Sequence, residues 1–334
     1  MTDRVSEVEP GRHRPIVLAD VGGTNARFAV SSATGRFDRV RGYRAAEYPS
    51  FPDALRTYLA DCFTDVGADG FAGARIAGAG PVNGRVIVLT NSPWRVSMDD
   101  VAGVLGVETG VALFNDLEAV GMALPYLGPG DCQVLGAAVP SPVAVPSPGR
   151  RAMLAVNVGT GFGASCAVPL TDGEWTATST EAGHISFAAR TSDEQRLLQT
   201  FDVVEDVLSG AGLVSLIHAV SSTPEAASDF DTPQALFASD AGWAIDIFTD
   251  VLARTAGDLV LAHGAWGGLY LCGSVAKTWA DRCSHQRLSR FRGVFNDKGK
   301  MSEHMKAVPV FVITAEHPAL IGLSIDRSSH GSHA

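Results

Sequence analysis

The sequence predicts an α/β fold with mixed sheets, made of two similar halves. Short apolar segments that suit strands alternate with segments whose apolar residues recur at helical spacing. A strand, a turn containing Gly and Thr, and a second strand occur in residues 15–30 and again in residues 152–168. The length of 334 residues is more typical of two domains than of one. We therefore expect two α/β domains related by duplication.

The first half begins with the segments "PIVLA" and "RFAV", which predict two strands joined by the turn "DVGGTN". Leu55, Tyr58, Leu59 and Cys62 follow at helical spacing and predict a helix. The remainder of this half alternates between the two kinds of element. Strands are expected at residues 74–80, 85–91 and 110–116, and helices at residues 98–106 and 117–127.

The second half follows a segment rich in Pro, Ser and Ala at residues 136–151, which predicts a loop between the two parts of the chain. After the second strand–turn–strand unit, apolar residues from Leu197 to Leu208 recur at three- and four-residue steps. We expect the chain from residue 193 onward to be mostly helical, and the default interpretation of Glu205, on an amphipathic helix by this spacing, is a solvated carboxylate. Late strands are predicted at residues 269–275 and 309–314.

Composition and charge narrow the class of protein. Hydrophobic residues make up 46% of the chain and charged residues 19%, which suits a globular protein with a sizeable core. The formal net charge of −10 disfavours nucleic acid or an anionic membrane as a partner, since both attract positive surfaces. The five cysteines are scattered without a CxxC pair, which predicts neither a disulfide framework nor a zinc cluster. Residues 1–14 form a polar leader unlike a secretory signal, and no apolar stretch reaches membrane-spanning length, so we expect a cytoplasmic protein.

The turn at residues 20–25 matches neither of two familiar glycine-rich nucleotide motifs. A Walker loop needs a lysine and leads into a helix, whereas "RFAV" has strand character. The segment "GAGPVNG" at residues 78–84 lacks the spacing of a dinucleotide-binding turn. The backbone N–H groups of the turn and the Thr24 hydroxyl can still hydrogen-bond phosphate oxygens, and Asp20 can hold a Mg²⁺-bound water.

The segment "VGTGFG" at residues 158–163 predicts a second phosphate-facing hairpin. Two such hairpins, one in each half, would suit a nucleotide held by two related domains. The alternative is that both are tight hairpins in which glycine supplies a positive φ. For either turn taken alone, the two interpretations are equally open.

Eight motifs occur in an order that resembles the proteobacterial type of glucokinase, and they cover nearly the whole chain after residue 15. These are "LADVGGTNARFAV", "LTNSPW", "FNDLEAVGMALP", "VGTGFG", "EAGHISF", "VLSGAGLVSL", "FNDKGK" and "HPALIG". The resemblance implies the actin-like (ribonuclease H-like) sugar kinase fold, with two duplicated α/β domains and a cleft between them. The implied small domain comprises residues 15–126 and 315–334, and the large domain comprises residues 127–314.

The same resemblance implies phosphorylation of glucose by ATP, with Asp116 as the general base on the 6-hydroxyl. The implied sugar ligands are Asn91, Asn115, Asp116, Glu181, His184 and Glu205. The implied nucleotide contacts are Asp20, Gly22, Gly23, Thr24, Asn25, Gly159, Thr160, Gly161 and Gly273. ATP and Mg²⁺ are the implied cofactors, with Mg²⁺ held through a water on Asp20. We further expect a homodimer that brings glucose into glycolysis.

The chemistry of these residues agrees with such roles. A sugar is a neutral ring edged with hydroxyls, which carboxylates and amides bind by hydrogen bonds. A carboxylate that takes the hydroxyl proton contributes roughly 10² to 10⁴ in rate. Each residue also has a plainer interpretation, since Asp116 could be a helix N-cap and His184 a hydrogen-bonded core residue.

Two residues depart from the family pattern, and other functions stay open. The family usually has two glycines in "EGGH", whereas here Ala182 replaces one of them before Gly183, and Ser274 follows Gly273 where the family usually has a second glycine. The alternatives are a hexose kinase that prefers mannose or glucosamine, and a non-catalytic sugar sensor. The related ROK group often carries a CxCGxxGC zinc site, which this chain lacks. The short leader and the acidic charge disfavour a DNA-binding sensor.

Overall fold

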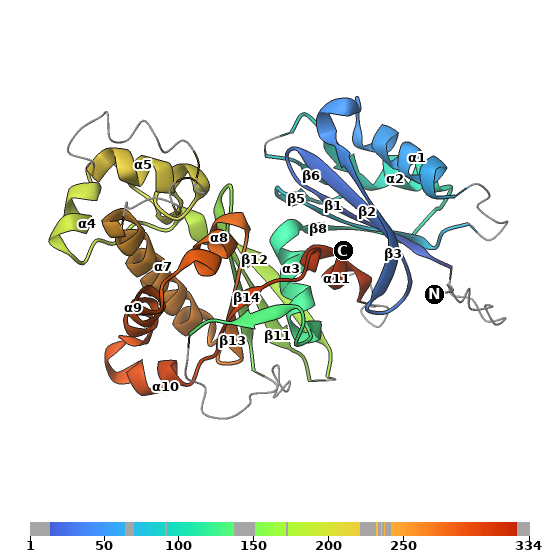
Figure 1. Ribbon diagram of the computed structural model, residues 1–334. Coiled ribbons are helices and arrows are strands. Elements are labelled where there is room, and N and C mark those ends of the chain that lie inside the picture. Colours follow the sequence, from blue (N-terminus) through green and yellow to red (C-terminus); the bar gives the residue numbers. More distant parts are fainter. Residues whose placement is uncertain are drawn as a thin grey trace, which may run out of the picture. The chain divides into compact units, whose positions relative to one another are not determined.

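The computed structural model describes residues 14–63, 70–90, 92–136, 151–171, 173–220, 232, 235, 237 and 242–325. They form two compact units (Figure 1). One unit comprises the described residues up to Ala119 and those from Ala319 onward, and the other is Val120–Pro318. The domain boundaries at residues 126, 127, 314 and 315 stay a prediction. Residues 1–13 of the expected leader and residues 137–150 of the expected loop lie outside the described residues.

The first unit is built on a five-stranded sheet in the order β3-β2-β1-β4-β8. The antiparallel part is the meander β1 (Ile16–Val21), β2 (Asn25–Ala33) and β3 (Arg36–Arg44). The strands β4 (Gly73–Gly78) and β8 (Val111–Asn115) continue the sheet in parallel with β1. A separate small sheet contains β5 (Val82–Asn83), β6 (Val86–Val88) and β7 (Arg95–Ser97).

Helices cover both faces of the five-stranded sheet (Figure 1). The helices α1 (Phe51–Cys62) and α2 (Met98–Leu105) pack on one face, where the fully buried Phe28 stacks on Tyr58. Side chains alternate along a strand, so Arg75 of β4 points to the opposite face from Ile76. There Arg75 donates hydrogen bonds to carbonyl oxygens at the end of α11 (Pro318–Ser324) and just after it. The short 3₁₀ helix η1 (Ala45–Glu47) follows β3.

The second unit repeats the same sheet plan. Its order is β12-β11-β10-β13-β14-β9, in which β10, β11 and β12 form an antiparallel meander and β13 and β14 run parallel to β10. The strands are β9 (Cys132–Val134), β10 (Met153–Val158), β11 (Phe162–Pro169), β12 (Trp175–Thr180), β13 (Gly268–Cys272) and β14 (Val310–Ile313). The shared order of five strands confirms the predicted duplication.

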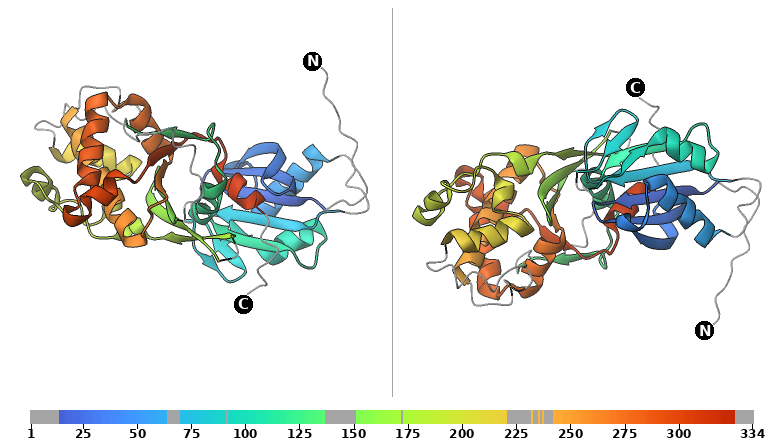
Figure 2. Two further views of the ribbon diagram at one scale, coloured as in Figure 1. Left: turned by 90° about the horizontal axis from the view of Figure 1, so that it is seen from below. Right: turned by 90° about the horizontal axis from the view of Figure 1, so that it is seen from above.

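The helices of the second unit gather beside this sheet (Figures 1 and 2). The longest, α7 (Gly242–His263), contributes most of its apolar side chains to the core. The others are α3 (Asp116–Ala123, which begins in the first unit), η2 (Leu124–Tyr126), η3 (Ala182–His184), α4 (Ser192–Leu197), η4 (Val204–Asp206), α5 (Gly210–Val220), α8 (Ser274–Arg282), α9 (His285–Asn296), η6 (Gly299–Met301) and α10 (Ser302–Lys306). Among the helices that the structure describes, none is long and apolar enough to cross a membrane.

The helix predicted from Leu197 to Leu208 is wrong. The helix α4 ends at Leu197, residues 198–200 form a turn, and Val203 then has extended backbone angles and forms a β-bridge with Ser186. The Phe187 N–H also donates to the Asp202 carbonyl at 2.9 Å. Pairing of Val203 with a residue 17 positions earlier therefore overrides the helical spacing of the apolar residues.

Candidate active site

The predicted site residues of the first unit lie at or next to the carboxyl ends of its parallel strands. The turn after β1 is adjacent to the end of β4, because the Ala79 N–H donates to the Val21 carbonyl at 3.0 Å. The Asn115 amide at the end of β8 donates to the Gly80 carbonyl at 3.4 Å. Ligand sites of parallel α/β sheets form at this edge. The structure thus brings Asn115 and Asp116 to the same sheet edge as the first predicted phosphate turn.

Asp116 is the first residue of α3, and its neighbour Asn115 caps this helix. The Asn115 Oδ1 accepts hydrogen bonds from the N–H groups of Leu117 at 2.9 Å and Glu118 at 3.3 Å. The Asp116 Oδ1 accepts a further bond from Leu117 N at 2.9 Å. The alternative role of Asp116 as the N-cap is therefore wrong, since Asn115 fills it. The positive partial charge at the start of a helix stabilises a carboxylate at the position of Asp116.

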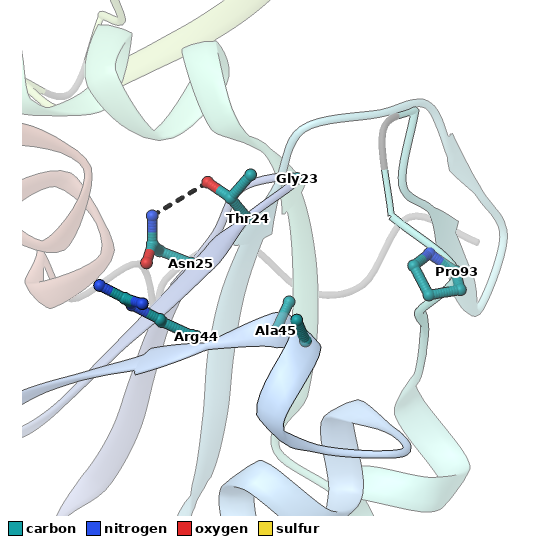
Figure 3. Close-up of a pocket in the computed structure, with 7 residues that line it drawn as sticks. Gly23, Thr24, Asn25, Arg44, Ala45 and Pro93 are labelled. Carbon is teal, nitrogen blue, oxygen red and sulfur yellow. Dashed lines mark hydrogen bonds between the residues drawn. The ribbon is translucent and has the colours of Figure 1, made fainter.

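The turn between β1 and β2 is held by its own hydrogen bonds. The Gly22 N–H donates to the Asn25 carbonyl at 2.9 Å, and the Ala45 N–H donates to the Thr24 carbonyl at 2.9 Å. The Asn25 amide donates to the Thr24 hydroxyl at 2.9 Å (Figure 3), which leaves the Thr24 hydroxyl hydrogen to donate elsewhere. The φ of Gly22 lies outside the left-handed region, so the expected positive φ does not explain this glycine.

A cavity of about 550 Å³ adjoins this turn. It is lined by Gly23, Thr24 and Asn25 of the turn, by Arg44, Ala45 and Ala46, and by Pro93. Asn91, a predicted sugar ligand, lies outside the described residues.

The second predicted phosphate turn, Gly159–Gly161, lies beside the starts of two helices. The Gly210 N–H at the start of α5 donates to the Gly159 carbonyl at 2.9 Å. Gly273, which precedes α8, has a φ of 92°, and a Cβ added there would lie 2.4 Å from the Val158 carbonyl oxygen. Only glycine fits such a position. Helix N-termini favour phosphate, so this part of the second unit suits the phosphates of a nucleotide.

Glu205 is not the solvated helix residue that its spacing suggested. It lies in the 3₁₀ helix η4, and its Oε2 accepts a 2.6 Å hydrogen bond from the Phe162 N–H, directly after the second turn. Two glycines make room for this carboxylate. A Cβ on Gly161 would lie 2.6 Å from Glu205 Oε2, and a Cβ on Gly183 would lie 3.1 Å from the same atom and 2.5 Å from the Phe162 carbonyl oxygen. No sequence pattern predicts this hydrogen bond, because its partners are 43 residues apart.

Glu181 precedes the short helix η3 and His184 is its last residue, and both side chains are exposed. Their exposed fractions are 86% and 67%, and Glu181 Oε2 lies 4.0 Å from His184 Nε2. The alternative role of His184 as a core residue is therefore wrong. Ala182, the departure from the family pattern, is buried with 3% exposed. Since Gly183 contacts Glu205, the structure brings all three predicted sugar ligands of the second unit close together.

The described part of the chain contains no group of three or more His, Cys, Asp or Glu side chains placed to hold a metal ion. A single carboxylate such as Asp20 nevertheless suits Mg²⁺, which keeps several waters and binds one or two carboxylates plus substrate phosphates. Asp20 Oδ2 also lies 3.6 Å from Arg27 Nη1. The residues present therefore fit an indirect Mg²⁺ contact, and they do not form a metal cage.

Comparisons with known proteins agree with this geometry. The family model described as "Glucokinase" matches residues 17–330. The glucokinase of Paramagnetospirillum magneticum is 34% identical over 325 residues, covering 92% of this chain and 96% of that protein. The glucokinase of Chromobacterium violaceum is 35% identical, covering 95% of this chain and 90% of that protein. The crystal structure of a glucokinase from an Antarctic psychrotroph matches with a TM-score of 0.77 at 29% identity, covering 93% of this chain and 98% of that chain. The predicted sugar kinase fold is confirmed.

Proposed function

The chain belongs to the glucokinase family and is an enzyme that phosphorylates glucose. We propose that Asp116 is the general base of this reaction. The 6-hydroxyl oxygen of glucose attacks the γ-phosphorus of ATP, the bond from this phosphorus to the β–γ bridging oxygen breaks, and ADP leaves. Asp116 takes the hydroxyl proton as the new O–P bond forms. The products are glucose 6-phosphate and ADP.

The observation that carries this role is the capping of α3 by Asn115. The Asn115 side chain accepts from the N–H groups of both Leu117 and Glu118, so the Leu117 N–H has an acceptor besides Asp116 Oδ1. Asp116 is half-buried at the carboxyl end of a parallel strand, where substrates of α/β proteins bind. General-base catalysis of this kind contributes roughly 10² to 10⁴ in rate.

We propose that the remaining hydroxyls of glucose are bound by Asn91, Asn115, Glu181, His184 and Glu205. The support for Glu205 is geometric. One carboxylate oxygen is fixed by the Phe162 N–H, which orients the other oxygen for a hydroxyl donor. Glu181 and His184 present exposed polar atoms next to it. A site of this kind rejects sugars that lack the matching hydroxyl, because a polar group covered by the bound sugar is then left unpaired.

We propose that ATP is bound through both glycine turns. Its phosphate contacts are Gly22, Gly23, Thr24 and Asn25 in the first unit and Gly159, Thr160 and Gly161 in the second, with Gly273 on the adenine side. Mg²⁺, when bound through a water on Asp20, supplies positive charge to the transferring phosphoryl group. A homodimer, a cytoplasmic location and a role at the entry to glycolysis complete the proposal.

An ATP-coupled assay over glucose, mannose and glucosamine tests the substrate. The expected result is a kcat/KM for glucose at least about tenfold above the other two, the size of discrimination that one lost hydrogen bond can supply. A higher value for mannose or glucosamine would reassign the hexose. Glucose binding without turnover of any sugar would support the non-catalytic sensor instead.

A further inference from the structure

Arg44 lies beside the first phosphate turn, although no motif marks it. The register of β2 and β3 pairs Asn25 with Arg44. Residues directly opposite in an antiparallel pair have neighbouring side chains on the same sheet face. Figure 3 shows the two side chains on the same side of the turn, with Thr24 hydrogen-bonded to Asn25. Both residues line the cavity of about 550 Å³, together with Thr24.

The lining of this cavity is rich in hydrogen-bond donors and carries a positive charge. The described residues that line it include no carboxylate. Arg44 is exposed, and within the described parts of the chain no carboxylate lies at ion-pair distance from it. Arg27, further along the same hairpin, is different because it pairs with Asp20 at 3.6 Å. Among the described residues, no carboxylate thus balances the positive charge of Arg44, which lies next to the Thr24 hydroxyl and the Asn25 amide.

Edge-strand protection does not account for this placement. Charged side chains on an edge strand prevent pairing with other chains, and β3 carries Arg36, Arg39, Arg41 and Arg44. A charged side chain at any position along β3 would prevent such pairing, so this role does not require an arginine at position 44. Arg39 has its own contacts, since it donates to the Cys62 carbonyl and lies over the Phe63 ring. Only Arg44 of these four lines the cavity at the turn.

We propose that Arg44 is a further phosphate-binding residue, which acts with Thr24 and Asn25 on a terminal phosphate group. The planar guanidinium can make two parallel hydrogen bonds to phosphate oxygens, and these charge-assisted bonds are stronger than neutral ones. The inference rests on the proposed function, which places a nucleotide phosphate at this turn. The phosphate comes either from the γ-position of ATP or from the 6-position of the product.

The test compares Arg44→Ala with Arg41→Ala, which removes the same charge from the same strand away from the cavity. Calorimetry measures the Kd of a non-hydrolysable ATP analogue, of ADP and of glucose 6-phosphate. Losing a hydrogen bond to a charged group weakens binding by roughly 10-fold to 100-fold, and we expect this for Arg44→Ala only. A γ-phosphate contact weakens the ATP analogue and spares ADP, whereas a product contact weakens glucose 6-phosphate.

Equal effects of the two substitutions, within about twofold on all three ligands, would overturn the inference. Arg44→Lys, which keeps the charge and loses the fork geometry, should recover only part of the affinity. The Tm of Arg44→Ala should match that of the wild type, because the side chain is exposed. Failure of the wild type to phosphorylate any hexose would instead defeat the proposed function, so the two failures are distinguishable.

Discussion

Replacing Gly161 by Ala should displace the Glu205 carboxylate. The added Cβ would lie 2.6 Å from Glu205 Oε2 and 3.3 Å from its Cδ, closer than a methyl group and an oxygen can approach. The φ of Gly161 is not left-handed, so alanine can adopt the backbone and the effect is purely steric. Glu205 must then give up its 2.6 Å hydrogen bond from the Phe162 N–H.

The size of the effect follows from the hydrogen bond that the displaced Glu205 carboxylate no longer makes to a glucose hydroxyl. A hydrogen bond to a charged group contributes about 1.5 to 3 kcal/mol, and about 1.4 kcal/mol is a factor of ten in affinity. If Glu205 holds a glucose hydroxyl only in its present position, Gly161→Ala should raise the Kd for glucose by about 10-fold to 100-fold. The KM for glucose should rise with it.

Gly159→Ala is the matched control, because it lies in the same turn. A Cβ there would have its nearest neighbours at 3.6 and 3.7 Å, in the Asn157 side chain, which is ordinary contact. Its Kd for glucose should stay within about threefold of the wild type, below the loss of one hydrogen bond. Calorimetric titration with glucose measures the Kd of both variants and of the wild type. A glucose Kd for Gly161→Ala within twofold of the wild type would refute the assignment of Glu205.

Three further predictions concern the sugar site, the core and the thiols. Glu205→Ala should raise the KM for glucose and narrow the gap in kcat/KM between glucose and either 1-deoxyglucose or 2-deoxyglucose, whereas equal weakening of all three sugars would indicate a role in the fold alone. Arg254→Ala should lower the free energy of unfolding, measured in urea, by about 3 to 5 kcal/mol, because the Glu194 carboxylate, 1% exposed, loses its buried partner. A loss under about 1 kcal/mol would contradict this prediction. Burial raises the pKa of the Cys132 and Cys283 thiols to about 12, so both stay protonated at pH 8. Both should therefore react slowly with iodoacetamide in the folded protein, as measured by mass spectrometry, and labelling as fast as that of free cysteine would contradict the burial.

The duplicated fold was predictable because each half begins with two apolar strands joined by a glycine-containing turn. Both turns and the buried strands β1, β10 and β14 lie where the sequence predicts them, whereas the strand predicted over residues 269–275 ends at Cys272 and α8 begins at Ser274. The strand β3 was not predicted, since its sequence "RFDRVRGYR" is charged and mostly exposed at the sheet edge. Apolar patterning marks only the elements that are buried.

The site was predictable only where its residues follow one another in the chain. Asn115 and Asp116 end a strand and begin a helix, as the local pattern predicts, whereas their roles at the site came from the family resemblance. The environment of Glu205 is tertiary, because it depends on Phe162 and on the space left by Gly161 and Gly183. Helical spacing placed Glu205 on the wrong element, since the bridge between Ser186 and Val203 is invisible to periodicity.

The turnover of Asp116→Asn tests the account most directly. Asparagine keeps an oxygen that can accept from Leu117 N, as Asp116 Oδ1 does at 2.9 Å, so the start of α3 should persist. The substitution keeps the size of the side chain and one acceptor oxygen, and it removes the negative charge and with it the ability to take a proton. We predict that kcat falls by roughly 10² to 10⁴ while the Kd for glucose stays within about threefold of the wild type. A variant that binds glucose normally and keeps more than about a tenth of the wild-type kcat would contradict the role of Asp116 as general base.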